Sequence, residues 1–331
     1  MEGMSSVECR VSSVEWPRGR SARLRPTAQT FKSAGERIWK SATQQTWKSA
    51  VGKLPKPPGS SERSLDTRRP TLDTPSMRVP IIAGVIRRRI LVNFRVDPEV
   101  MARQLPAPMR PKLHGGAAIA GICLIRLEAI RPKRFPAWCG IASENAAHRV
   151  AVEWDEDGVL REGVYIPRRD TGSWLNHLAG GRLFPGEHHL ADFRVETVAE
   201  NIDLEVSSRD GAVAIRLRGE TAKSLPADSG FATLGEASAF FCAGSLGFSV
   251  TSDPGRLDGM ELKVCDWKVE PLAVTEVFSS YFSDVTRFPP GSVEFDCALR
   301  MRDLVHEWHS AGEMAVTEPA RSRETKFALS E

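Results

Sequence analysis

The feature of this sequence that most restricts its fold is a series of strand-like segments separated mainly by turns. β-branched and aromatic residues are concentrated in these segments, and Asp-Gly or other Gly-containing turns follow several of them. A parallel doubly wound sheet would need a helix between successive strands, and that alternation is missing here. The sequence therefore predicts a β-rich α+β domain, with one antiparallel core and a few short helices.

Local signals place the expected elements. Asp97 precedes Pro98 and Glu99, an order in which Asp caps a helix, Pro suits its first position and Glu favours its positive end. The acidic turn 155–158 joins two strand-like segments into a predicted hairpin. The residues 306–309 indicate a solvated helix end. The expected strands are 84–96, 115–130, 149–154, 159–166, several between 191 and 280, and 291–301, and the expected helices are 98–104, 173–180 and 234–244.

Charge divides the chain into an arm, a body and a tail. Residues 1–77 carry 14 Lys and Arg against 7 Asp and Glu, which leaves 31 basic and 35 acidic residues elsewhere. The arm is rich in Ser, Pro and Arg, and its aromatic-Lys-Ser-Ala motif recurs every eight residues, a period that does not keep to one helix face. We expect 1–77 to be a disordered basic extension, 78–310 to be the folded domain and 311–331 to be a flexible tail.

Composition argues against several classes of function. The body is slightly acidic, which does not support nucleic-acid binding, and no apolar stretch approaches the ~20 residues that span a bilayer. The six cysteines are at least 16 residues apart, so the chain has no Cys-x-x-Cys pair. Glycine-rich nucleotide-binding, zinc-protease and serine-hydrolase motifs are also missing. We expect a cytoplasmic protein with reduced thiols, and with no membrane or nucleic-acid partner, metal or cofactor.

Polar residues are densest in the segment 144–192, where His, Arg and acidic side chains recur. A metal site at His177, His188 and His189 is one interpretation, although neighbouring residues of a strand point to opposite faces. A second interpretation is a pocket that binds a small organic anion through Arg and His donors. The third is an ordinary polar surface. Histidine titrates near neutrality, so the segment is the best candidate for a functional site.

Several motifs of the body resemble acetoacetate decarboxylase-like proteins. In 92–109 a strand ends at aromatic-Arg-x-Asp and is followed by a short helix and by Leu-Pro and Pro-Met steps. In 144–189 a Glu, a Gly-x-Tyr-x-Pro strand, a Gly-Arg and a Phe-Pro follow in order, and 266–308 resembles the YqjF-like branch, domain of unknown function 2071 (DUF2071). The resemblance covers 78–309. It implies an acetoacetate decarboxylase-like antiparallel β-barrel or sheet core that encloses a pocket.

The resemblance also implies a site, and one part of that site is missing. Enzymes of this family form a Schiff base between a lysine and a β-keto acid, with an arginine and a glutamate nearby. Arg87 and Glu144 match the last two positions. The family has Pro-Lys-Lys after its Gly-Arg, whereas this chain has Pro-Gly-Glu-His-His at 185–189, and no lysine lies between Lys133 and Lys223. Schiff-base decarboxylation is therefore not expected.

Two hypotheses about function remain. The first is a protein that binds a small organic acid or carbonyl compound in an enclosed pocket, without Schiff-base chemistry. The alternative is a lysine-independent lyase or hydrolase that uses Glu and His as acid and base. Assembly into a homo-oligomer is compatible with either. The candidate catalytic residues are Glu144, His188 and His189, and the candidate ligand-binding residues are Arg87, Tyr165, Arg169 and Arg182.

Overall fold

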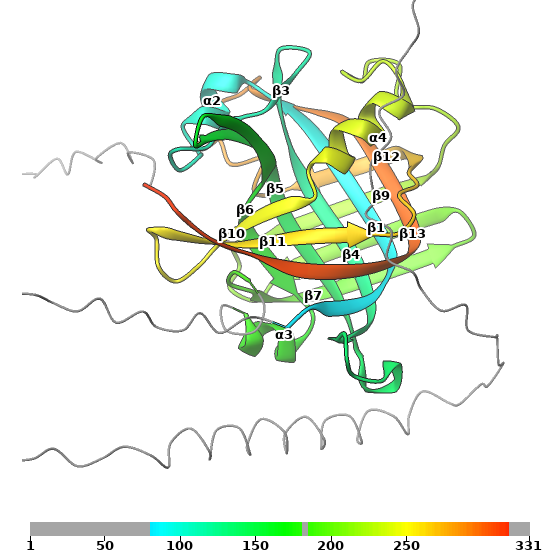
Figure 1. The fold of residues 1–331 in the computed structure, drawn as a ribbon. Coiled ribbons are helices and arrows are strands. Elements are labelled where there is room, and N and C mark those ends of the chain that lie inside the picture. Colours follow the sequence, from blue (N-terminus) through cyan, green and yellow to red (C-terminus); the bar gives the residue numbers. More distant parts are fainter. Residues whose placement is uncertain (1–79, 181–184, 318–331) are drawn as a thin grey trace, which may run out of the picture. The chain divides into compact units, whose positions relative to one another are not determined.

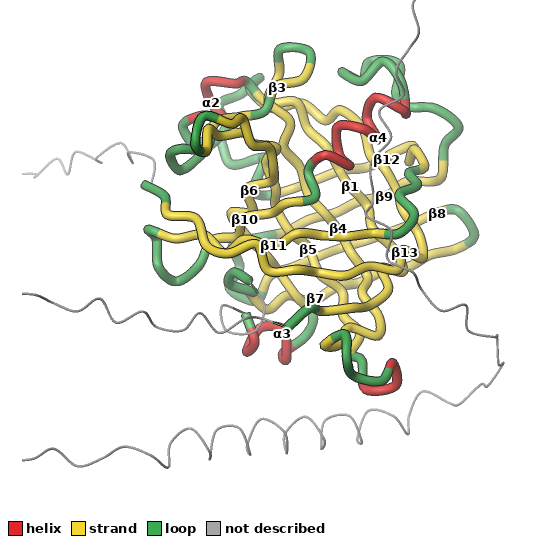
Figure 2. The backbone as a smooth tube through the Cα atoms, viewed as in Figure 1, coloured by secondary structure: helices red, strands yellow, loops and turns green. Residues whose placement is uncertain are grey.

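The computed structural model describes residues 80–180 and 185–317 of the chain. Strands dominate this part of the chain, and the helices are short (Figures 1 and 2). The strands are β1 Ile82–Val96, β2 Arg110–Pro111, β3 Leu113–His114, β4 Ala117–Pro132, β5 Ile141–Glu156, β6 Val159–Thr171, β7 His189–Val198, β8 Asn201–Ser208, β9 Ala214–Thr221, β10 Leu246–Val250, β11 Arg256–Val264, β12 Glu270–Ser279 and β13 Val293–Ala315. The helices are α2 Pro98–Ala102, α3 Trp174–Ala179, α4 Leu234–Ala243 and the short 3₁₀ turn Ala137–Cys139.

All thirteen strands belong to one sheet, which is mostly antiparallel. The order of the main path is β11-β10-β6-β7-β8-β9-β12-β13-β1-β4-β5-β2, with β3 paired to β4. Only the β6–β7 and β6–β10 pairings are parallel. Two further pairings, β11–β13 and β5–β6, make the path return on itself, so the sheet curves around an interior. The predicted β-rich α+β fold is confirmed.

The two faces of the sheet pack into two hydrophobic clusters. Side chains alternate along a strand, so Ile90 and Val92 of β1 belong to one cluster, and Leu91 belongs to the other. Helix α4 covers the second cluster, where Phe241 is buried and Phe240 is half-buried. The second cluster borders the cavity described below.

The predicted helices form close to the expected positions, and side-chain caps fix where they start. The Asp97 side chain accepts hydrogen bonds from the amides of Glu99 (2.9 Å) and Val100 (3.0 Å), as expected from the sequence. Helix α2 ends at Ala102, two residues before the expected boundary. Ser173 caps α3 and Thr233 caps α4 in the same manner.

The end of the domain differs from the sequence-based expectation. Strand β13 continues to Ala315, so the expected boundary at residue 310 falls inside a strand. The predicted helix end at 306–309 is wrong, because these residues pair with β11 through the register Leu262↔Trp308 and Val264↔His306. The charged residues of 302–313 interrupt the apolar pattern by which a strand is predicted from the sequence. Within residues 80–180 and 185–317 no helix has the length and apolar character needed to cross a membrane.

Candidate functional site

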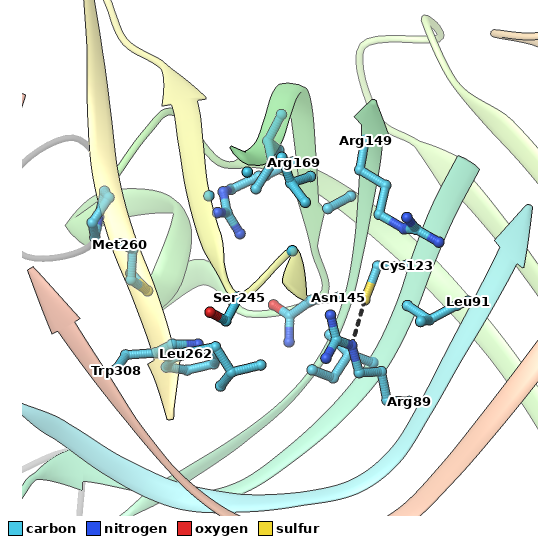
Figure 3. Close-up of a pocket in the computed structure, with 18 of the residues that line it drawn as sticks. Arg89, Leu91, Cys123, Asn145, Arg149, Arg169, Ser245, Met260, Leu262 and Trp308 are labelled. Atoms are coloured by element: carbon cyan, nitrogen blue, oxygen red, sulfur yellow. Dashed lines mark hydrogen bonds between the residues drawn. The ribbon is translucent and has the colours of Figure 1, made fainter. Parts of the chain in front are cut away.

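A cavity of about 160 Å³, partly open to solvent, lies against one face of the sheet (Figure 3). Strands β1, β4, β5 and β6 form one wall, and α4, β10 and β11 form the other. Most of the lining is apolar, and it includes the aromatic side chains of Phe240, Phe241 and Trp308. A concave, largely apolar cavity with a few polar groups is the usual form of a small-molecule site.

Three arginines from three strands point into this cavity. They are Arg89 on β1, Arg149 on β5 and Arg169 on β6. Their hydrogen-bond partners are neutral. Arg89 donates to the Cys123 sulfur (3.4 Å), Arg169 donates to the Ser249 hydroxyl (2.9 Å), and Arg149 donates to the Asn93 side-chain oxygen. Among the described residues, none of the three forms an ion pair with a carboxylate.

Burial of these guanidinium groups is energetically costly. Desolvation lowers the pKa of Arg149 to about 10 and that of Arg169 to about 10, and nearby charges, such as Asp258 beside Arg169, offset this only in part. Both groups are therefore still cationic at neutral pH. The Nε atom of Arg149 and the Nη1 atom of Arg89 have no hydrogen-bond partner among the described residues. Positive charge thus accumulates in the cavity without a carboxylate in hydrogen-bonding contact with these arginines.

Amides and hydroxyls form a neutral polar corner of the same cavity. Asn176 of α3 donates to the Ser143 hydroxyl (3.1 Å), and Thr171 donates to the side-chain oxygen of Asn145 (2.7 Å). The Asn176 side-chain oxygen is buried and has no donor among the described residues. This corner adds one unused acceptor to the unused donors of the arginines.

A lysine also reaches the lining. The Lys112 ammonium lies 2.5 Å from a carboxylate oxygen of Glu162 and 4.7 Å from the centre of the Phe240 ring. The pair is neutral as a whole. Asp170, the other acidic residue of the lining, pairs with Arg168 at 2.8 Å, so the three arginines remain the cations of the lining without a carboxylate partner among the described residues.

Two of the residues predicted from the sequence lie in the lining, namely Arg169 and His188. Burial, followed by the charge of Arg169, lowers the pKa of His188 to about 3, so its ring is neutral at physiological pH. One ring nitrogen, Nδ1, lies 3.1 Å from the Gly186 carbonyl oxygen. His188 can offer the cavity a neutral imidazole.

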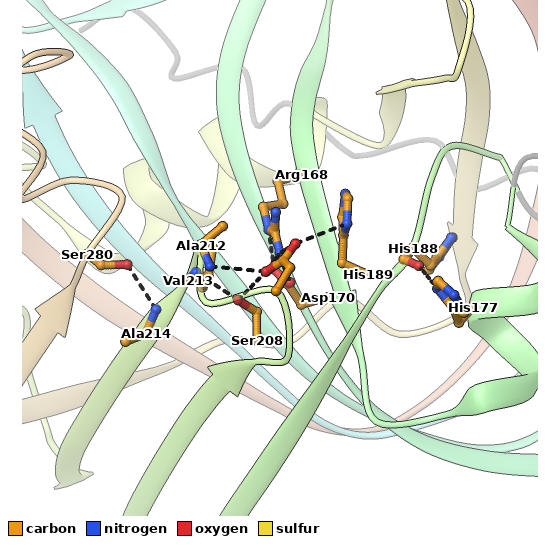
Figure 4. A network of polar contacts seen from close by, with 11 residues as sticks. Arg168, Asp170, His177, His188, His189, Ser208, Ala212, Val213, Ala214 and Ser280 are labelled. Atoms are coloured by element: carbon orange, nitrogen blue, oxygen red, sulfur yellow. Dashed lines mark hydrogen bonds and ion pairs between the residues drawn. The ribbon is translucent and has the colours of Figure 1, made fainter.

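The other predicted residues lie elsewhere. Arg87 is half exposed and pairs with Glu128 and Asp303, and Glu144 pairs with Arg88 at 2.6 Å. His189 faces Asp210 at 3.4 Å in a separate polar network (Figure 4). Tyr165 packs against the other hydrophobic cluster. Arg182 lies outside the described residues.

The alternative of a histidine metal site gains no geometric support. The His177 ring contacts the backbone carbonyl of His188, whereas the His189 ring is directed toward Asp210 (Figure 4). Within the described residues, no three His, Cys, Asp or Glu side chains gather where they could hold a metal ion.

A β-bulge explains why Arg89 lines the cavity and Arg87, which was expected there, does not. The register of β1 against β4 shifts between Ile86 and Arg88, and Arg87 falls at that irregularity. A bulge interrupts the alternation of side chains along a strand. Arg149 could have been considered from the sequence, because it lies within the polar segment 144–192, but only cross-strand pairing shows which face it occupies.

These observations define a β-rich domain with a cavity that carries buried positive charge. Residues 85–290 match the family model of DUF2071, described as an uncharacterized conserved protein, over more than half of the chain. The chain belongs to the DUF2071 family, as its motifs predicted. A comparison with curated proteins found no match.

Solved structures with a related arrangement include acetoacetate decarboxylase-like proteins. Acetoacetate decarboxylase from Legionella pneumophila is 9% identical, with a TM-score of 0.47 and 77% of this chain and 99% of that chain covered. An acetoacetate decarboxylase-like enzyme from Sphingomonas wittichii is 12% identical, with a TM-score of 0.45 and coverages of 73% and 94%. An enduracididine biosynthesis enzyme complexed with pyruvate is 14% identical, with a TM-score of 0.43 and coverages of 74% and 94%.

Proposed function

We propose that this protein binds a small organic acid or carbonyl compound in the cavity, without Schiff-base chemistry. The observation that carries the proposal is the convergence of Arg89, Arg149 and Arg169 on one apolar cavity, without a carboxylate partner among the described residues. A bound carboxylate supplies the missing counter-charge, and a planar guanidinium holds it through two hydrogen bonds.

The apolar part of the lining limits the kind of acid. Leu91, Ile125 and Leu262 offer no hydrogen bonds, so the ligand needs an anionic end and a short apolar or carbonyl-bearing end. The cavity of about 160 Å³ has room for an acid of a few carbon atoms.

Acid–base catalysis has less support from the geometry. Of the three residues expected for it, only His188 lies in the lining, because Glu144 pairs with Arg88 and His189 faces Asp210. His188 is neutral at physiological pH, since its pKa is about 3. It can accept a proton weakly but offers no imidazolium as a general acid.

The test is thermal unfolding of the full chain with pyruvate, lactate and succinate at neutral pH, against chloride at equal ionic strength. A ligand at 100 times its dissociation constant stabilises by ~2.7 kcal/mol, which raises the melting temperature by about 5–10 °C in a domain of this size. The Arg149→Met and Arg169→Met variants should lose that response. If none of the acids raises the melting temperature of the unmodified chain, the proposal is wrong.

Arg87→Met serves as the matched control. It removes the same side chain from a half-exposed ion pair outside the cavity. Exposed pairs contribute little to stability, so this variant should melt near the unmodified chain and keep the full response to acids. A lost response in Arg87→Met would mean that charge in general, and not the cavity, governs acid binding.

A further inference from the structure

Cys123 on β4 lies in the cavity beside the arginines. Its sulfur accepts a hydrogen bond from Arg89 Nε at 3.4 Å, and Figure 3 shows the sulfur between the side chains of Arg89 and Arg149. A negative charge on this sulfur would favour the charged forms of both Arg149 and Arg169. Among the described cysteines, Cys123 is the one that contributes to the lining.

The surroundings of Cys123 differ from those of Cys139, Cys265 and Cys297. Cys297 is fully buried, and desolvation together with Asp296 raises its pKa to about 12, so it stays a neutral thiol. Cys139 donates its thiol hydrogen to the Pro136 carbonyl (2.9 Å), and Cys265 is exposed at the surface. Cationic surroundings are those in which a cysteine acts as a nucleophile.

Two buried polar side chains indicate, independently of the cysteine, that the cavity takes a ligand. Arg149 is only 5% exposed and its Nε donor is unused, and Asn176 is only 7% exposed and its side-chain oxygen is unused. Both groups belong to the cavity lining. Buried polar atoms are normally paired, so a ligand with an acceptor near Arg149 would remove an unfavourable arrangement.

We propose that Cys123 adds reversibly to the carbonyl carbon of a 2-oxo acid held by the cavity arginines. The inference rests on the proposed function and names its ligand class. In the step the sulfur forms a bond to the carbonyl carbon, the carbon–oxygen π bond breaks, and the thiol proton moves to the carbonyl oxygen. The product is a hemithioketal, and no oxidant, reductant or leaving group is needed.

The 2-oxo acids fit because their two reactive parts are adjacent. The electrophilic carbon is bonded directly to the carboxylate, so guanidinium groups that hold the carboxylate also place that carbon beside Cys123. Arg89 donates a hydrogen bond from Nε to the Cys123 sulfur, and its Nη1 donor has no partner among the described residues. That donor can stabilise the negative charge that develops on the carbonyl oxygen during addition.

Carboxylate-directed alkylation tests the placement of the thiol. Iodoacetate and iodoacetamide both transfer a two-carbon group to sulfur with loss of iodide, and they differ in charge. At an ordinary thiol iodoacetamide reacts faster. At Cys123 of the full chain we expect iodoacetate to react about tenfold faster, the effect of one carboxylate–guanidinium contact, with Cys265 as the internal control in the same peptide map. Equal or reversed rates at Cys123 would overturn the inference.

Carbon NMR with pyruvate labelled at its carbonyl carbon tests the adduct itself. Free pyruvate already gives one tetrahedral carbon signal, that of its hydrate. The unmodified chain should add a second tetrahedral signal, that of the sulfur adduct, which is lost in Cys123→Ser and Cys123→Ala and kept in Cys265→Ser. If pyruvate raises the melting temperature but no second tetrahedral signal forms, the inference fails while the proposed function stands. If pyruvate neither stabilises the chain nor forms the signal, both fail.

Discussion

The Arg149 guanidinium donates a hydrogen bond to the Asn93 side chain, although strand β4 lies between their strands. The residue of β4 in this row is Gly121, which pairs with Asn93 on one side and with Arg149 on the other. A Cβ atom at Gly121 would meet the backbone of Val92 and Asn93 on β1. A side chain at this position would therefore displace the strand that carries Asn93, the hydrogen-bond partner of Arg149.

Substitution of Gly121 by alanine should damage both stability and binding. An added Cβ atom would lie 2.1 Å from the Val92 carbonyl oxygen, and this backbone contact cannot be relieved by a rotamer change. We expect Gly121→Ala to lower the free energy of unfolding by about 1–3 kcal/mol or more, measured by urea denaturation. Gly235→Ala in α4, where the nearest atom is 3.8 Å away, is the control and should not destabilise. A neutral Gly121→Ala would show that the backbone adjusts at this position.

Buried neutral histidines should make the fold sensitive to acid. Burial lowers the pKa of His148 to about 3, well below the ordinary 6.5, and neither ring nitrogen has a partner among the described residues. Below pH 6.5 the unfolded chain binds a proton at this residue and the folded chain does not. The contribution of His148 to stability is therefore complete above pH 6.5 and is lost as the pH falls toward about 3, at up to ~1.4 kcal/mol per pH unit.

The measurement is the free energy of unfolding between pH 7.5 and pH 5 in the unmodified chain and in His148→Phe. The variant keeps a ring against Tyr281, which lies 4.5 Å from the His148 ring centre. We expect its stability to fall less steeply with acid, by about 1.4 kcal/mol per pH unit. At pH 7.5 the histidine is neutral in both the folded and the unfolded chain, so the difference in stability between the two proteins at this pH measures the change in packing alone. Parallel pH profiles for the two proteins would contradict a neutral buried His148.

The sequence predicted the local features of this fold better than its site. Most strand segments and the Asp97 cap depend on alternation and side-chain chemistry within a few residues, so the sequence alone predicts them. The cavity depends on contacts between distant residues. The bulge at Arg87, which excludes that residue and admits Arg89, is a property of the β1–β4 register. Similarly, Lys112 meets Glu162 across 50 residues, and no local pattern shows this pairing.

Loss of the Asp97 cap should have a modest and specific cost. The Asp97 carboxylate accepts from two amides at the start of α2, and Asp97→Ala would leave both without that partner. We expect a loss of about 1 kcal/mol in the free energy of unfolding. Asp97→Asn retains an acceptor and should lose much less. If both variants behave like the unmodified chain, solvent replaces the cap and α2 contributes little to stability.

Borohydride trapping should leave the lysines unmodified. Lys112 is the lysine of the cavity lining, and its amine would have to lose a proton before attacking a keto acid. The Lys112 nitrogen lies 2.5 Å from a Glu162 carboxylate oxygen and 4.7 Å from the centre of the Phe240 ring, so these contacts hold it away from a keto acid in the cavity. We expect that treatment of the full chain with acetoacetate and borohydride adds no mass at Lys112, as measured by peptide mass spectrometry.

The Glu162→Gln variant makes this prediction sharper. It removes the charge that holds the ammonium while keeping a side chain of similar size. If trapping at Lys112 occurs in Glu162→Gln but not in the unmodified chain, the ion pair is what suppresses Schiff-base formation. A borohydride-stable adduct on Lys112 of the unmodified chain would instead show that this lysine serves as the nucleophile despite its partner, and the exclusion of Schiff-base chemistry would be wrong.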